Sequence, residues 1–166
     1  MELSISFSTI ITTALSFLGV YFLMPLLLIV RDFLILKVID KYILNDEFWM
    51  WLRMVSTDKA IHNERFAERK TQMSFHSTGR TYSIDGQEVS EQAYQSFERG
   101  REMHLSRINT IEPKIIMRKN LIEWAEKYYK LDSDLTKQIN GFANRVYDNQ
   151  VRILKEEQET KQPPVQ

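Results

Sequence analysis

The sequence predicts a mainly α protein, in which a single transmembrane helix precedes a small helical domain with one β-hairpin. Three observations predict this class. No charged side chain occurs between Leu3 and Val30. Glycine and proline, which interrupt helices, number only five and four in the 166-residue chain. The pair Asp85-Gly86 lies between short runs of alternating apolar and polar residues, a pattern typical of a hairpin.

Residues 1–30 are predicted to be a transmembrane anchor. As a helix, the uncharged run would reach roughly 42 Å, which exceeds the hydrocarbon thickness of about 30 Å. A cleaved signal peptide is disfavoured, because the chain starts Met1-Glu2 without a basic region and no small-residue cleavage pattern follows the run. The anchor is therefore expected to stay in the chain.

Basic residues predict the orientation of this anchor. Only Glu2 is charged before the span, and five basic residues follow it: Arg31, Lys37, Lys41, Arg53 and Lys59. Lysine and arginine are enriched on the cytoplasmic side of membranes. We expect the N-terminus outside and the C-terminal domain in the cytoplasm.

Composition limits what the remaining residues can do. The chain carries 22 basic and 22 acidic residues, so it lacks the excess positive charge typical of nucleic-acid binding. It contains no cysteine, which excludes disulfides and thiolate sites. The length beyond the span suits one small domain.

Residues 31–57 are predicted to form a juxtamembrane amphipathic or interfacial helix. This segment contains an aromatic block, of which Phe48, Trp49 and Trp51 are candidate membrane-interface residues. Indole rings favour the boundary between lipid and water. The same residues could equally form ordinary core of the following domain.

Residues 58–155 are predicted to form a cytoplasmic helical domain with a hairpin at 80–89. A charged helix is expected from Asp58 to Gln72, followed by a break. In a hairpin with a two-residue loop at Asp85-Gly86, Ile84 would pair with Gln87 and Tyr82 with Val89. Ser90 would then cap a helix that stops before Pro113.

Two further apolar seams follow that proline. Met117, Leu121, Trp124 and Tyr128 recur at helical spacing in a helix over residues 114–130. A second seam, beyond a helix end near residues 131–134, contains Asn149 and five apolar candidate partner-interface residues: Leu135, Ile139, Phe142, Val146 and Ile153. The seams could belong to one long helix or to a helical hairpin, and could pack within the chain or between copies. The final residues 156–166 are charged and are expected to be disordered.

The sequence offers little for catalysis. His62, His76 and His104 do not form a metal-binding spacing, and no phosphate-binding glycine loop or nucleophile motif occurs. We therefore expect a non-enzyme without catalytic, cofactor-binding or metal-binding residues, and without a cofactor.

The function predicted from these features is a membrane-anchored interaction or assembly protein, an accessory subunit that holds a partner or itself at the membrane. Its expected partners are the lipid bilayer and another membrane or membrane-associated protein, with self-association possible and no nucleic acid. The alternative is a pore-forming or membrane-disrupting protein, because the architecture resembles that of holins. A pore usually needs a polar stripe along its span, whereas Phe17–Val30 is almost wholly apolar.

Overall fold

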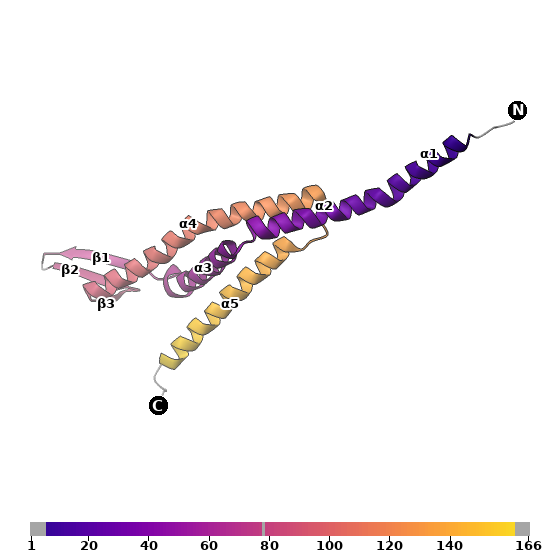
Figure 1. Cartoon of the computed structure of the whole chain (residues 1–166). Helices are drawn as coiled ribbons and strands as arrows, with labels where there is room; N and C mark the ends of the chain where they lie inside the picture. The colour runs from indigo at the N-terminus through magenta and orange to yellow at the C-terminus, as the bar shows by residue number, and fades with distance from the viewer. Residues whose placement is uncertain (1–5, 78, 162–166) are drawn as a thin grey trace.

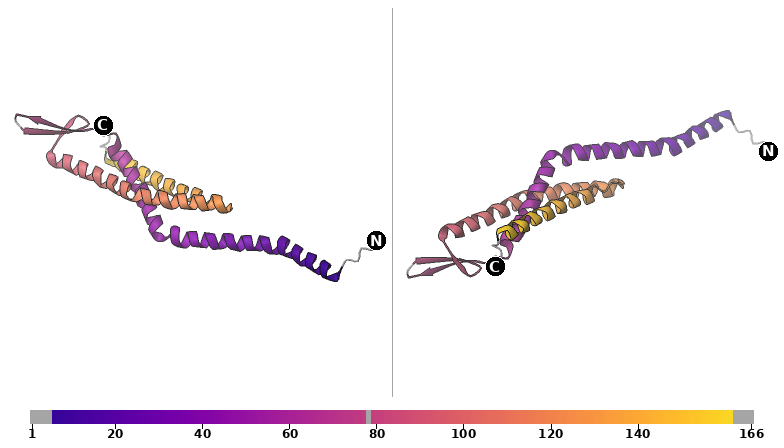
Figure 2. Two further views of the ribbon diagram at one scale, coloured as in Figure 1. Left: turned by 90° about the horizontal axis from the view of Figure 1, so that it is seen from above. Right: turned by 90° about the horizontal axis from the view of Figure 1, so that it is seen from below.

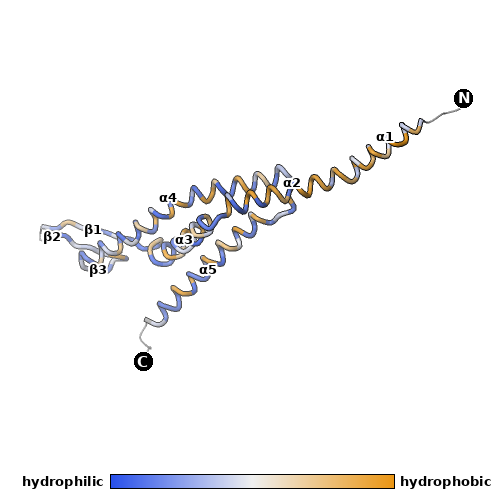
Figure 3. Tube along the Cα trace, in the orientation of Figure 1, coloured by the Kyte–Doolittle hydropathy of each residue, from blue (hydrophilic) through white to orange (hydrophobic). Residues whose placement is uncertain are grey.

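The computed structural model describes residues 6–77 and 79–161 as a mainly α fold with a small antiparallel sheet. The described chain begins with a long helical rod, whose N-terminal part projects away from the remaining elements (Figure 1). The rod is continuous through α1 (Phe7–Leu18), η1 (Gly19–Leu23), α2 (Met24–Val38) and η2 (Ile39–Ile43). Figure 3 shows its hydrophobic character over α1 and α2, in contrast to the mixed helices that follow.

The rod contains a wide helical turn, η1, immediately before Pro25. Proline has no N–H to donate and its ring crowds the carbonyl one turn earlier. In this turn the N–H of Met24 donates to the carbonyl of Gly19, five residues earlier, in place of the usual four. The wider turn lets the helix continue past Pro25 without a break.

Helix α3 (Asp46–His62) begins after a sharp break at Leu44 and Asn45. The side chain of Asn45 caps it by accepting a hydrogen bond from the Phe48 N–H at 3.1 Å. The predicted juxtamembrane helix is thus two helices that meet at this break. A π-helical turn, η3 (Asn63–Ala67), follows α3 and ends the helix. The helix predicted over the charged segment thus ends before Gln72, which lies in a strand.

Three strands follow, in the order β1-β2-β3: β1 (Thr71–His76), β2 (Gly79–Ile84) and β3 (Gln87–Val89). The expected register is confirmed, because Tyr82 pairs with Val89 and Ile84 pairs with Gln87. Asp85 and Gly86 both have positive φ, at 52° and 79°, as a type I′ turn requires. The sequence did not predict β1, which extends the hairpin to a three-stranded sheet.

Helix α4 (Glu91–Tyr129) begins at Ser90, whose hydroxyl accepts from the Ala93 N–H at 3.2 Å, as predicted. The predicted end before Pro113 is wrong, because α4 continues through this proline. A mid-helix proline costs about 3 kcal/mol relative to alanine. Ile108 and Ile115, on either side of it, are buried, and we attribute the continuity of α4 to this packing.

The chain turns back after α4 and forms α5 (Leu135–Lys161). Lys130 adopts a left-handed conformation with φ of 51°, which ends α4. Glu126 then holds the turn, because its carboxylate accepts from the Leu135 N–H at 2.9 Å and the Thr136 hydroxyl at 2.7 Å. The seams therefore lie on two helices that fold back, and not on one long helix. Residues 156–161 are helical and not disordered, while 162–166 lie outside the described residues.

The hydrophobic core forms where α3 packs between α4 and α5 (Figure 2). Its most enclosed side chains are Phe48, Ile122 and Ile139, each less than 2% exposed. Ile39, from the C-terminal end of the rod, is 3% exposed and belongs to the same cluster. The end of the apolar rod is thus part of the core of the domain, so the two are not joined by a flexible linker.

Candidate functional site

The helical rod is long and apolar enough to span a membrane. Its best window has a mean hydropathy of 2.2, and none of that window is buried against other elements. Apolar side chains from Phe7 to Val30 are exposed along its length. Exposure of so large an apolar surface is unfavourable in water and favourable in lipid.

Two hydroxyl groups of the apolar rod donate hydrogen bonds to backbone carbonyls of their own helix. The hydroxyl of Thr12 donates to the carbonyl of Ser8, and that of Thr13 to the carbonyl of Thr9, each at 2.8 Å. Such bonds lower the cost of placing a hydroxyl in hydrocarbon. They give no support to the alternative of a polar pore lining.

The aromatic block of α3 lies inside the domain. Phe48 is fully enclosed, and Trp49 packs edge-on between Phe48 and Phe142, with ring centroids 5.6 and 5.2 Å away. Trp51 lies under the Lys114 and Arg118 side chains, whose charged groups are 5.2 and 4.8 Å from its ring centre. This corrects the membrane-interface interpretation for Phe48, because its neighbours leave no surface for lipid. Trp49 and Trp51 are half-buried in these contacts.

The predicted partner-interface residues on α5 divide between core and surface. Ile139 is 1% exposed and belongs to the core, so it cannot contact a partner in this conformation. Leu135 and Phe142 are half-buried against the same cluster. Val146 is half-buried and Ile153 is exposed. Most of this seam therefore packs within the chain, as the intramolecular alternative expects.

An open groove of about 680 Å³ lies between α3 and α5, where part of the seam remains accessible. Phe142 and Val146 supply its apolar surface, and Arg53 and Arg145 its positive charge. Neither guanidinium forms an ion pair with a carboxylate among residues 6–77 and 79–161. The groove thus combines apolar contact area with two uncompensated positive charges.

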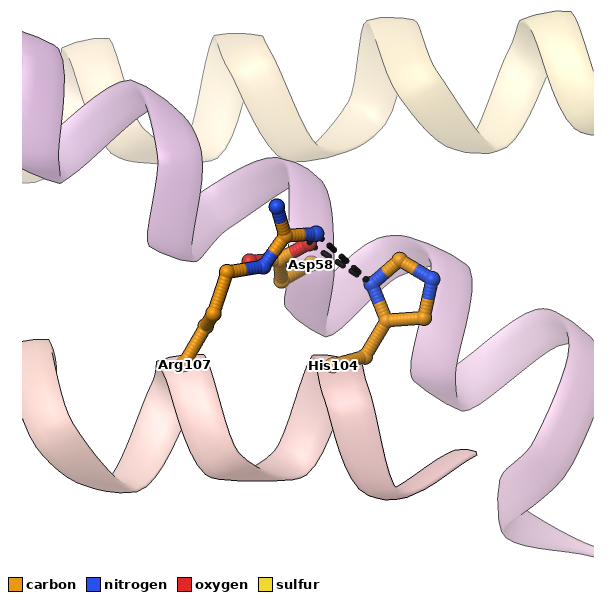
Figure 4. Close-up of polar contacts among 3 residues, drawn as sticks. All are labelled: Asp58, His104 and Arg107. Carbon is orange, nitrogen blue, oxygen red and sulfur yellow. Dashed lines mark hydrogen bonds and ion pairs between the residues drawn. The ribbon is translucent and has the colours of Figure 1, made fainter. Parts of the chain in front are cut away.

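A buried polar cluster joins α3 to α4 (Figure 4). Oδ1 of Asp58 lies 2.7 Å from Nδ1 of His104, and it accepts a hydrogen bond from Nη2 of Arg107 at 2.6 Å. Asp58 is 2% exposed and His104 is 9% exposed. The carboxylate accepts from both groups, so His104 must carry its proton on Nδ1. Nδ1 of His104 and Nη2 of Arg107 lie 3.3 Å apart because both donate to the same oxygen of Asp58.

The Asp58–His104 pair resembles the aspartate and histidine of a catalytic triad, but its surroundings favour a structural role. The ring of Phe66 lies 5.9 Å from the ring of His104 and covers it. No hydroxyl hydrogen-bonds to His104 in the described part of the chain. The geometry lacks the nucleophile that general-base catalysis would serve. Its chemistry fits a charged bridge that fixes the register of α3 against α4.

Sequence reasoning missed this cluster because Asp58 and His104 are 46 residues apart. The one available signal was the spacing of His104 and Arg107, which places both on one face of a helix. Within residues 6–77 and 79–161, no group of three or more histidine, aspartate or glutamate side chains could hold a metal ion.

Known protein families, curated proteins and solved structures were compared with this chain, and none of them matches it.

Proposed function

We propose that this protein is a membrane-anchored, non-catalytic interaction protein that holds a partner at the membrane surface through the groove between α3 and α5. The observation that carries the proposal is the combination in that groove of apolar Phe142 and Val146 with Arg53 and Arg145. Neither arginine forms an ion pair within the part of the chain that the structure describes. The exposed apolar rod supports the membrane location.

The helical rod that contains the anchor supports this role, because its C-terminal end packs inside the domain. Ile35 and Leu36 pack against the core cluster, and Ile39 is part of it. A domain fixed in this way presents its groove in one orientation relative to the span, which lowers the entropic cost of binding a partner at the same membrane. Basic residues after the span favour an N-terminus outside and a cytoplasmic domain.

The chemistry of the groove indicates an acidic partner segment with apolar side chains. Two guanidinium groups at one groove repel each other unless a carboxylate lies between them. A carboxylate often binds a guanidinium group through two parallel hydrogen bonds. Phe142 and Val146 would contact the apolar side of the segment. An acidic amphipathic helix of another membrane protein, or of a second copy, has the required pattern.

The experiment that tests this proposal reverses both charges of the groove, with Arg53→Glu and Arg145→Glu in the full chain. Proteins that travel with the chain are cross-linked in its native membrane and identified after detergent extraction and pull-down. The double variant should lose its cross-linked partner, or its own dimer, because two repulsive contacts replace two attractive ones. It should remain in the membrane fraction, since neither arginine belongs to the span.

A matched control is Arg99→Glu on α4, which changes an exposed arginine far from the groove in sequence. This variant should keep the same cross-linked species. If the groove variant also keeps them, the groove does not bind the partner and the proposal is wrong.

A further inference from the structure

An exposed aromatic pair lies at the C-terminal end of α4. The rings of Trp124 and Tyr128 stack with centroids 5.2 Å apart and planes inclined by 14°. Both side chains are exposed, at 54% and 66%. Tyr129 packs edge-on against both rings. This group is separate from the aromatic block of α3 and from the groove between α3 and α5.

Two contacts fix where this end of α4 lies along the rod. A guanidinium N–H of Arg31 donates to the carbonyl of Tyr129 at 3.2 Å, and the guanidinium lies 5.7 Å from the Tyr129 ring centre. Farther along, Arg118 donates to the carbonyl of Ile43 at 3.3 Å. The two helices therefore run antiparallel, and the turn after α4 points toward the span (Figure 1).

The spacing along both helices agrees. From Arg31 to Ile43 the rise is about 18 Å, and from Arg118 to Tyr129 it is about 16.5 Å. The two segments thus lie side by side over their common length. Tyr129 is consequently level with Arg31, the first charged residue after the apolar run.

The position of Tyr129 beside Arg31 determines which residues of the α4 seam can contact lipid. The headgroup layer is about 5–8 Å thick on each side of the hydrocarbon. Measured back along α4 from Tyr129, Tyr128 lies about 1.5 Å away and Trp124 about 7.5 Å away. Leu121 and Met117 lie about 12 and 18 Å away, beyond that layer. Only the aromatic half of the seam falls within it.

We propose that Trp124 and Tyr128 form a second membrane contact, in which their rings lie in the headgroup layer beside the span. Tryptophan and tyrosine are the side chains that this layer favours. The end of α4 and the turn after it carry Lys127 and Lys130 against three acidic residues, Glu126, Asp132 and Asp134. This region therefore has no excess of positive charge to attract anionic headgroups, and the contact is not electrostatic. The proposal rests on membrane insertion of the rod, and it would hold the domain against the bilayer at two points.

The experiment measures the depth of Trp124 in the bilayer by fluorescence quenching, in a variant that has no other tryptophan. The full chain with Trp49→Phe and Trp51→Phe keeps Trp124 as its one tryptophan. It is inserted into phosphatidylcholine nanodiscs that hold one chain each. Iodide then quenches fluorescence from the water, and phosphatidylcholine with a headgroup spin label quenches it from the lipid. A matched control adds Trp124→Phe and Met117→Trp, which moves the reporter about 10 Å away along α4.

Trp124 should be quenched strongly by the spin-labelled lipid and several-fold less by iodide than the reporter at position 117. Equal access of iodide to both reporters would overturn the proposal. Protection of Trp124 only in discs that hold two chains would also overturn it, because a second copy would then be the occupant. Failure of the chain to enter nanodiscs would refute the anchor itself, and with it this proposal.

Discussion

Replacement of Phe48 by alanine tests whether the aromatic block of α3 is core or membrane surface. Phe48 is fully enclosed, so Phe48→Ala removes a whole buried ring and leaves a cavity. Changes of this kind cost about 3–5 kcal/mol. The edge-on contact with Trp49 adds about 1 kcal/mol, so we expect a loss near the upper end of that range. Since small domains are stable by only about 5–15 kcal/mol, this loss is a large fraction of the total.

Near-ultraviolet circular dichroism of the full chain in mild detergent micelles measures this effect, because Trp49 and Trp51 report on the packing around Phe48. The unfolding midpoint should fall by about 20 °C, because a loss of about 5 kcal/mol shifts it by about 4 °C for each kcal/mol in a domain of this size. Met50→Ala, on the same helix but 57% exposed, is the control and should change stability by less than about 0.5 kcal/mol. Equal, small effects of the two substitutions would refute the assignment of Phe48 to the core.

Three further substitutions test other parts of the fold. Asp58→Asn should destabilise the domain by about 3 kcal/mol in urea unfolding, because it removes the charge that His104 and Arg107 share; an unchanged midpoint would contradict a buried bridge. Gly86→Ala should cost about 1 kcal/mol and accelerate amide exchange in the sheet alone, because φ at this position is +79°; uniform exchange throughout the chain would argue against the turn. Pro113→Ala should raise the urea midpoint by restoring a helical N–H, worth about 1–3 kcal/mol, and a lowered midpoint would show that α4 depends on this proline.

Local signals in the sequence were sufficient to predict the long apolar helix and the hairpin. A long uncharged run and an Asp85-Gly86 turn depend on neighbouring residues only, and so does the cap at Ser90. These features were predicted with the correct register and cap. The strand β1 escaped prediction because its burial does not alternate, and Met73 and Phe75 are both exposed. Its pairing with β2 supplies the hydrogen bonds that the pattern could not indicate.

Features that depend on packing over long sequence distances could not be predicted. The propensity of Pro113 predicts a helix end, but burial of Ile108 and Ile115 outweighs it. The hydrophobicity of Phe48 is compatible with either lipid or core, and only its contacts with other helices distinguish the two. On α4, likewise, only the packing of the helices shows which apolar residues are core: Ile122 is buried, whereas Trp124 and Tyr128 are exposed.

Carbonate extraction of membranes that contain the full chain tests whether the helical rod spans the bilayer. If Phe7–Val30 spans the bilayer, the protein should remain with the membranes at alkaline pH and float with them in a density gradient, because no ionic contact holds it there. Release of the intact chain into the carbonate supernatant would show that the rod does not span the bilayer, since a peripheral protein would behave in this way.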